Sequence, residues 1–481
     1  IDENKQPIQE FKDKEGRVVL KRINIKAKLE APLNSSGNHD TYYVYDVYGN
    51  LTFVLPPQLI KAGISTDNLA SLGYQYQYDE KNRLIEKQLP GKGREFLVYD
   101  NQDRLVASQD ALQRQNGGYF SFTHYDKFGR IAAQGQHPEP GVSRISLQAY
   151  LNGLGSNNVE RTTTSYNHSG LDIFYTRAYG GDQATSTYTT VNYYDNYQNL
   201  SITPSAINGQ SVIGTDDTKT KGLAVASFTS VLGTTTWNKN FTFYDTKYVR
   251  PVASSSTNYL GGYTNTASNL DFRGKVKNTV TKHKPNNAGL EVTINEGFEY
   301  YDNELLKYQT HQINNGAIEY IVQNSYNEIN QLTNKKVGNT NSSSPLQNVD
   351  YKYNIRGWMT DINNIYATGE GFNDLFSFQI GYSNLYNGNI SSTFWKSAHS
   401  ERLLGYNYEY DGLNRLLTGT FINNPMYTSV NYTYNEYIKG YDYNGNIRGV
   451  TRTGDALNFY NPIDDLTYDY QGASNKLLAV T

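Results

Sequence analysis

Histidine is the first side chain to test for chemistry, because it binds metals and transfers protons near neutral pH. No pair has the His-x-x-x-His spacing of a helical metal site, and no His-Glu-x-x-His zinc motif occurs. We therefore interpret every histidine as a surface or strand residue. The seven are His39, His124, His137, His168, His283, His311 and His399.

Nucleophile and cofactor motifs are the next signals to look for. The sequence has no Gly-x-Ser-x-Gly elbow, no P-loop and no Gly-x-Gly-x-x-Gly fingerprint. It also has no cysteine, which excludes thiol nucleophiles, disulfides and thiolate metal sites. We therefore predict that the chain is not an enzyme, with no catalytic, cofactor-binding or metal-binding residues and no cofactor.

Two weaker signals could mark binding sites. The run from Asp442 to Asn446, Asp-Tyr-Asn-Gly-Asn, is similar to half of a calcium loop but lacks the distal Glu. A turn-capping role for Asp442 is the preferred interpretation, and calcium is the alternative. Trp237, Trp358 and Trp395 could stack against sugar rings, although structural pairing across strands is favoured. The glycosylation-like triplet at 167–169 is expected by chance in a chain so rich in these residues.

A short pattern recurs along the chain: Tyr-Asp-x-x-Gly/Asn-Arg-Leu/Ile. Asp at the first position of a type I turn accepts backbone N–H groups, and Gly or Asn tolerates the positive φ at the fourth. Ten Tyr-Asp dipeptides occur, where random placement would give about two or three. Each copy predicts a strand, a turn and a second strand. Copies begin at Phe11, Tyr45, Tyr78, Tyr99, Tyr125, Tyr194, Tyr244, Tyr301, Tyr326, Tyr353, Tyr410, Tyr443 and Tyr468.

Composition agrees with a repeat array. Only 37% of the 481 residues are hydrophobic, yet 44 are Tyr, which suits a sheet with a thin, partly polar underside. The net charge of −3 shows none of the excess of basic residues that is typical of nucleic-acid-binding proteins. No run approaches the roughly 18 apolar residues of a membrane span.

The array is predicted to run over residues 1–481 without a domain boundary, as part of a longer chain. Residues 141–190, rich in Ser, Thr, Asn and Gly, are interpreted as an irregular insertion between hairpins. Residues 65–73, which begin with Ser and end with Gly, are the best candidate for a helix.

These repeats resemble the YD-repeat or RHS-repeat family. The match is carried by Tyr45–Leu51, Tyr125–Ile131 and Tyr410–Leu416, and it extends from Phe11 to Thr481. Two longer stretches, 353–363 and 386–396, resemble the RHS proteins of Bacteroidota. The resemblance implies an all-β fold: a long antiparallel β-hairpin ribbon coiled into a spiral or partial hollow shell, with one or two short helices.

The resemblance also implies a function. Family members enclose or present a C-terminal toxin or effector used in competition between bacteria, so we expect a non-enzymatic shell segment of a secreted or cell-surface protein. Its partners would be its own C-terminal domain beyond Thr481 and, for a Bacteroidota-type protein, the type IX outer-membrane translocon. The toxin-release motifs of the family are absent, so no residue inherits a protease role. The alternative is a cell-surface adhesin whose aromatic outer face binds glycans.

Overall fold

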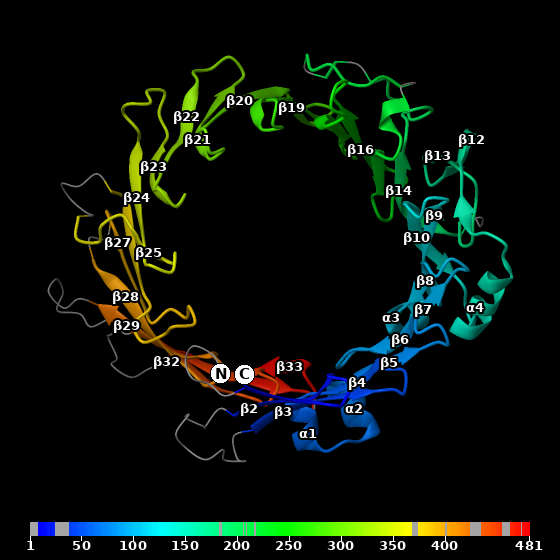
Figure 1. Ribbon diagram of the computed structural model, residues 1–481, viewed down its shortest axis with the longest axis horizontal. Coiled ribbons are helices and arrows are strands. Elements are labelled where there is room, and N and C mark those ends of the chain that lie inside the picture. The colour runs from blue at the N-terminus through cyan, green and yellow to red at the C-terminus, as the bar shows by residue number, and fades with distance from the viewer. Residues whose placement is uncertain are drawn as a thin grey trace. The chain divides into compact units, whose positions relative to one another are not determined.

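The computed structural model shows an all-β chain of consecutive antiparallel strands (Figure 1). It describes residues 8–24, 38–181, 185–204, 206–207, 209–215, 218–367, 374–399, 402–423, 434–454, 462–472 and 474–481. The predicted all-β hairpin ribbon is confirmed, but the described residues contain four short α-helices, where one or two were expected. No helix in these ranges is long and apolar enough to cross a membrane.

The chain divides into two compact units, which are described separately. Unit 1 comprises Ile1–Arg94, Ser325–Lys336 and Gln347–Thr481, and unit 2 comprises Glu95–Asn324 and Val337–Leu346. The sequence prediction placed no boundary within the array. The first boundary follows a short Pro-Gly-Lys-Gly loop at 90–93.

Unit 1 contains the first and the last hairpins of the chain. Its neighbouring strands pair antiparallel in chain order, from β1 to β6 and again from β24 to β33. The elements are β1 (Ile8–Lys12), β2 (Val18–Asn24), β3 (Asn38–Tyr45), β4 (Leu51–Leu55), α1 (Pro57–Ala62), α2 (Thr66–Leu72), β5 (Tyr74–Tyr78), β6 (Leu84–Gln88), β24 (Gln347–Tyr353), β25 (Met359–Ile362), β26 (Phe376–Gly381), β27 (Ser392–Ser397), β28 (Leu404–Tyr410), β29 (Leu416–Asn423), β30 (Glu436–Tyr441), β31 (Ile447–Thr453), β32 (Pro462–Tyr470) and β33 (Leu477–Val480).

Unit 2 holds the middle of the chain, and two further strands lie at the unit boundary. The elements of unit 2 are β7 (Glu95–Tyr99), β8 (Leu105–Gln109), α3 (Ala111–Gln115), β9 (Tyr119–Asp126), β10 (Ile131–Pro138), α4 (Arg144–Gly153), β11 (Asn158–Val159), β12 (Arg161–His168), β13 (Leu171–Tyr175), β14 (Thr187–Tyr194), the 3-10 helix η2 (Thr218–Thr220), β15 (Ala224–Ser230), β16 (Trp237–Tyr244), β17 (Pro251–Thr257), β18 (Gly261–Leu270), β19 (Val276–Asn286), β20 (Val292–Tyr300) and β21 (Leu306–Ile313). The boundary strands are β22 (Glu319–Tyr326) and β23 (Leu332–Val337).

The predicted turn is present, as the hairpin of β9 and β10 shows. Gly129 N donates to Asp126 O at 3.0 Å, which closes a type I turn, and Asp126 N donates to Arg130 O at 3.0 Å. Gly129 has a φ of 78°, and Asn82 takes the same position in another copy with a φ of 60°. The extra left-handed residue shifts the register at the end of each such strand, as in a bulged hairpin.

In several copies of the motif, the aspartate acts as the predicted cap of its turn. Asp126 Oδ1 accepts the backbone N–H groups of Phe128 at 2.9 Å and of Arg130 at 3.0 Å. The same pair of bonds recurs at Asp13, Asp46, Asp79, Asp100, Asp411 and Asp442. These carboxylates therefore have a structural role that accounts for their recurrence.

The helix predicted at 65–73 is confirmed as α2. Ser65 caps it by accepting from Asn68 N at 3.1 Å, and the helix ends before Gly73. Leu72 is fully buried.

The predicted insertion at 141–190 lies between β10 and β14, which pair with each other. It contains more regular structure than its composition indicates. Within it, α4 buries Leu147 and Leu151, and β12 and β13 form a separate two-stranded sheet. The largest buried hydrophobic cluster among the described residues lies in unit 2 and includes side chains of this insertion, such as Ile173 and Tyr175.

Candidate functional site

The histidines were interpreted as strand or surface residues, and the structure agrees. Six of them lie in strands, and His399 is an exposed turn residue. Within the described ranges, no group of three or more His, Cys, Asp or Glu side chains is arranged to hold a metal ion. His283 and His311 bind ordinary neighbours, Thr264 Oγ1 at 2.8 Å and Glu319 Oε2 at 3.1 Å.

Three histidines that are far apart in sequence meet in unit 2. His124 Nε2 contacts Tyr179 O at 2.8 Å, and His168 Nε2 contacts Ser186 O at 2.7 Å. His137 Nδ1 lies 3.0 Å from Ser186 Oγ. Sequence spacing could not show this cluster, because the contacts join strands to a loop between 18 and 55 residues away.

Ser186, His137 and Glu139 contain the residue types of a serine-hydrolase triad. The second nitrogen of His137, Nε2, lies 3.2 Å from Glu139 Oε1. Ser186, however, donates its hydroxyl proton to Gly180 O and is only 4% exposed. Activation of a serine requires that this proton be given to the histidine. The arrangement instead ties the loop that leads into β14 to the hydrophobic core.

The calcium-like run from Asp442 to Asn446 is a capped turn. Asp442 Oδ1 accepts from Asn444 N and Asn446 N, and Oδ2 accepts from the Asn446 side chain at 2.7 Å. Both carboxylate oxygens are therefore already used by the turn. This geometry supports the capping role that was preferred over calcium.

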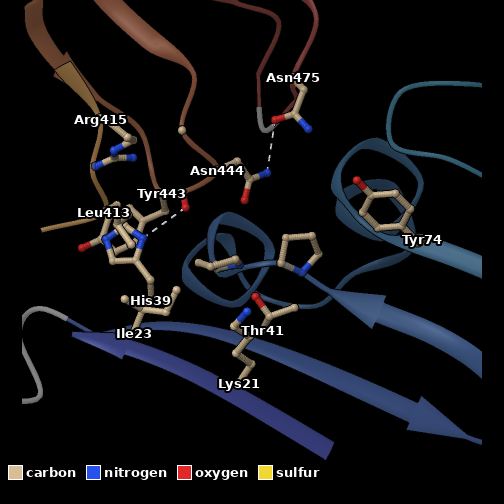
Figure 2. Close-up of a pocket in the computed structure, with 13 residues that line it drawn as sticks. Lys21, Ile23, His39, Thr41, Tyr74, Leu413, Arg415, Tyr443, Asn444 and Asn475 are labelled. Atoms are coloured by element: carbon tan, nitrogen blue, oxygen red, sulfur yellow. Dashed lines mark hydrogen bonds between the residues drawn. The ribbon is translucent and has the colours of Figure 1, made fainter. Parts of the chain in front are cut away.

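The same turn makes a contact that the sequence did not predict. Within unit 1 it lies against β3 and α1, which are about 400 residues earlier in the chain (Figure 2). His39 Nδ1 lies 3.3 Å from Tyr443 O, and the two rings stack with centroids 5.0 Å apart. Lys61 covers the Tyr443 ring, with its ammonium 4.0 Å from the centroid. Contact between the segment of β3 and α1 and the turn between β30 and β31 therefore belongs to the fold of unit 1.

Backbone and amide groups complete this contact. Gln58 N donates to Asn444 Oδ1 at 3.0 Å, and Asn444 Nδ2 donates to Asn475 Oδ1 at 3.1 Å. His39 is 8% exposed, and its burial lowers the pKa of the imidazole below the usual value. The neutral imidazole is therefore favoured where the two ends of the array meet.

A cleft of about 320 Å³ lies beside this contact. Its lining contains Lys21 and Arg415 but no carboxylate, and Arg415 is paired with Asp411 at 2.6 Å. Aromatic rings and side-chain amides supply most of the other polar groups. The lining residues are Lys21, Ile23, His39, Thr41, Pro56, Pro57, Tyr74, Leu413, Arg415, Tyr443, Asn444, Gly445 and Asn475 (Figure 2).

The three tryptophans take part in structural contacts. Trp237 is 7% exposed and donates its indole N–H to Ser169 O at 3.0 Å in unit 2. In unit 1, Trp358 packs against Tyr382 with centroids 5.0 Å apart, and Trp395 stacks on Tyr406 at 5.8 Å. These contacts agree with the interpretation that favoured pairing over a sugar platform.

The repeat tyrosine makes a recurring contact between successive hairpins. Its hydroxyl donates to a carbonyl at or just before the start of the strand that follows an earlier turn, as Tyr125 does to Leu105 O at 3.0 Å. The bond recurs for Tyr45, Tyr78, Tyr194, Tyr244, Tyr353, Tyr382, Tyr410, Tyr441 and Tyr470. We call this contact the tyrosine tie. Burial raises the pKa of Tyr125, so the hydroxyl keeps the proton that it donates.

The repeat arginine strengthens the same contact. In its own turn, Arg104 Nε donates to Asp100 Oδ2 at 2.8 Å, and its guanidinium lies 4.8 Å from the centroid of the Tyr125 ring. The ring contact recurs for Arg17 over Tyr45, Arg130 over Tyr194 and Arg415 over Tyr441. Through these contacts the repeat arginine links neighbouring hairpins.

Comparisons with known proteins identify the fold. No protein-family model matches the sequence, and no similar curated protein is found. Solved structures with a similar fold include chains from the crystal structures of TcdB2-TccC3-Cdc42 and of TcdB2-TccC3. Each has a TM-score of 0.66 at 14% identity, and each alignment covers 98% of this chain and 20% of the other.

A chain of the Photorhabdus luminescens Tc holotoxin pore is similar to the same degree. Its TM-score is 0.65 at 14% identity, with 99% of this chain and 20% of that chain covered. This chain therefore spans about a fifth of the length of these proteins. The likeness supports the RHS/YD-repeat fold that the sequence resemblance implied.

Proposed function

We propose that this chain is a non-enzymatic wall segment of a larger RHS-type shell. The observation that carries the proposal is the tyrosine tie, which joins hairpin to hairpin in both units. A contact repeated in this way builds an extended wall and leaves the individual repeats without a site of their own. The likeness to chains of Tc toxin complexes supports the same function.

The shell would belong to a secreted or cell-surface protein and would enclose or present a C-terminal toxin or effector used against other bacteria. Its partners are then its own C-terminal domain and the export machinery, which for a Bacteroidota protein is the type IX translocon. The absence of Cys agrees with export that does not depend on disulfides.

Limited proteolysis of the complete gene product tests enclosure. An unspecific protease should spare a C-terminal fragment while the shell is folded, and should digest it once urea has opened the wall. The same fragment expressed alone is the control, and it should be digested without urea. Rapid digestion of the fragment within the folded protein would rule out a shell.

The alternative function, a glycan-binding adhesin, draws on the cleft beside the unit 1 contact. Tyr74, Asn444 and Asn475 line it, and aromatic rings with amides are side chains that bind sugars. A glycan array with the 481-residue chain distinguishes the two functions. Selective binding that is lost in Asn475→Ala would favour the adhesin, whereas a shell wall should bind no glycan selectively.

A further inference from the structure

A second cleft forms in unit 2 where the insertion meets the repeat array. The turn between β9 and β10 supplies Lys127, Phe128 and Arg130 to one side. Glu160 and Arg161, at the start of β12, line the other side. The volume of about 780 Å³ falls within the roughly 300–1,000 Å³ of ligand-binding sites. The insertion supplies Val159, Glu160, Arg161 and Tyr175 to the lining, so it helps to form this cleft.

Two of the three carboxylates in the lining, Asp126 and Asp195, are already paired with Arg130. Arg130 donates Nη1 and Nη2 to Asp195 at 2.8 Å each, and Nε to Asp126 Oδ2 at 2.6 Å. Asp195 Oδ1 also accepts from Gly222 N at 2.7 Å. This network is a fixed wall of the cleft, and with one guanidinium between two carboxylates it keeps one net negative charge.

The remaining charged groups are mostly cationic. Lys127 and Lys221 are exposed in the lining, and Glu160 is the third carboxylate. Arg161 donates Nη2 to Gln198 O at 2.9 Å, and its guanidinium lies over the Tyr193 ring, 4.6 Å from the centroid. Its Nη1 is shielded from water and has no hydrogen-bond acceptor, so a nearby anion would offset the cost of burying this charge. With four cationic and three anionic side chains, the lining carries a net charge of +1, whereas the chain as a whole carries −3.

An apolar surface lies beside these cations. Phe128 is 70% exposed at the rim, and Val159 and Tyr175 are buried in the floor at 1% and 4% exposure. Large exposed aromatic side chains next to charged groups are typical of binding surfaces. The matching ligand has an anionic group adjacent to an apolar one.

We propose that this cleft binds an acidic peptide segment. A carboxylate side chain of the peptide pairs with the exposed Lys127 and Lys221, near the buried guanidinium of Arg161, and an adjacent apolar side chain packs on Phe128. Glu160 accepts a backbone N–H of the peptide. A phosphate or nucleotide ligand would instead be repelled by the negative charge of Glu160. This inference does not depend on the shell function.

Titration of the 481-residue chain with fluorescein-labelled hexapeptides tests the proposal by fluorescence anisotropy. A peptide of alternating Asp and Phe should bind saturably, and its Asn–Phe counterpart should bind at least about tenfold more weakly. Lys127→Glu combined with Lys221→Glu should weaken binding of the acidic peptide by about tenfold or more. Glu160→Gln should strengthen it, because a like charge is removed.

Matched variants distinguish binding at this cleft from nonspecific attraction between the acidic peptide and lysines elsewhere on the chain. Lys14 follows Asp13 in unit 1 as Lys127 follows Asp126, and both lysines are exposed, so Lys14→Glu should leave binding unchanged. Phe128→Ser should weaken binding without loss of folding, because Phe128 is 70% exposed. Equal affinity for the Asp and Asn peptides would overturn the proposal. So would an equal loss in Lys14→Glu, or displacement of the peptide by millimolar inorganic phosphate.

Discussion

Arg104 and Tyr125 belong to the repeat motifs of two successive hairpins, and contacts between them hold the two hairpins together. The guanidinium lies 4.8 Å from the ring centroid, and the Tyr125 hydroxyl donates to the carbonyl of Leu105, the residue that follows Arg104. One residue therefore covers the ring while its neighbour accepts the hydroxyl proton. Arg104 also donates to Asp126 O at 3.2 Å, so the next turn is fixed as well.

This relationship explains why Tyr, Asp and Arg recur together. Asp shapes a turn and holds its own Arg, and that Arg forms part of the surface on which the next Tyr packs. Each motif therefore takes part in two interfaces, one with the hairpin before it and one with the hairpin after it. This is expected for a repeat protein in which neighbours stabilise each other. The recurring residues are structural in this interpretation, so a ligand-binding site is expected where the array departs from its repeat.

The tyrosine tie can be tested by removing one hydroxyl. Tyr125→Phe keeps the ring over which Arg104 lies but leaves the half-buried Leu105 carbonyl without its donor. We expect a loss of about 1 kcal/mol in the free energy of unfolding, measured from the urea midpoint. Tyr259→Phe is the control, since Tyr259 is 56% exposed and should change stability by less than about 0.5 kcal/mol. Equal effects of the two variants would show that the tie adds no stability.

Arg130 joins two turns that are far apart in sequence. Its guanidinium makes three hydrogen bonds, one to Asp126 and two to Asp195, which lies 65 residues away. Lysine keeps the charge but cannot reproduce the forked geometry, so Arg130→Lys should destabilise the chain by about 2 kcal/mol. Arg273→Lys is the matched control, because its pair with Glu304 is exposed and should be worth less than about 0.5 kcal/mol. Urea unfolding curves of both variants provide the comparison.

The turns could be predicted from sequence because their physics is local. Asp126 and Gly129 act on residues within four positions, so type and spacing determine the turn. The tie of Tyr194 to Ile131 spans 63 residues, and that of Tyr125 to Leu105 spans 20, so no fixed spacing identifies the acceptor. Long-range packing, and not local pattern, decides these contacts.

The sites were harder to predict for the same reason. Arg161 and Lys127 come from separate segments that meet only through the insertion, whose polar composition indicated an irregular loop. His39 and Tyr443 are 404 residues apart. The aspartate of the calcium-like run at Asp442 was interpreted correctly from sequence, because capping is a local property.

The contact between His39 and Tyr443 should make unit 1 sensitive to acid. Burial lowers the pKa of His39 below its ordinary value of 6.5, so the unfolded chain takes up this proton at a higher pH than the folded chain. The free energy of unfolding should therefore decrease as the pH falls below about 6.5. The charged groups nearby are Arg415, Asp411, Asp40 and, on the far face of Tyr443, Lys61.

The slope of stability against pH measures this effect directly. Urea midpoints between pH 7.5 and pH 5 should change less in His39→Gln than in the natural sequence, whatever the absolute stability of the variant. His399→Gln is the control, since His399 is exposed and its removal should leave the slope as it was. An unchanged slope in His39→Gln would mean that other groups cause the acid sensitivity.

Replacing glycine by alanine should have opposite effects on stability at two exposed positions of unit 2. Gly129 has a φ of 78° with no atom within 4 Å of an added Cβ, so Gly129→Ala meets backbone strain without steric contact. We expect a loss of about 1 kcal/mol. Gly153, at the end of α4, has equal space but an ordinary φ, so Gly153→Ala should be neutral or stabilising by up to about 1 kcal/mol. Opposite signs in the two urea midpoints would show that the left-handed backbone at position 129 favours glycine over alanine. Equal signs would contradict the geometry of this turn.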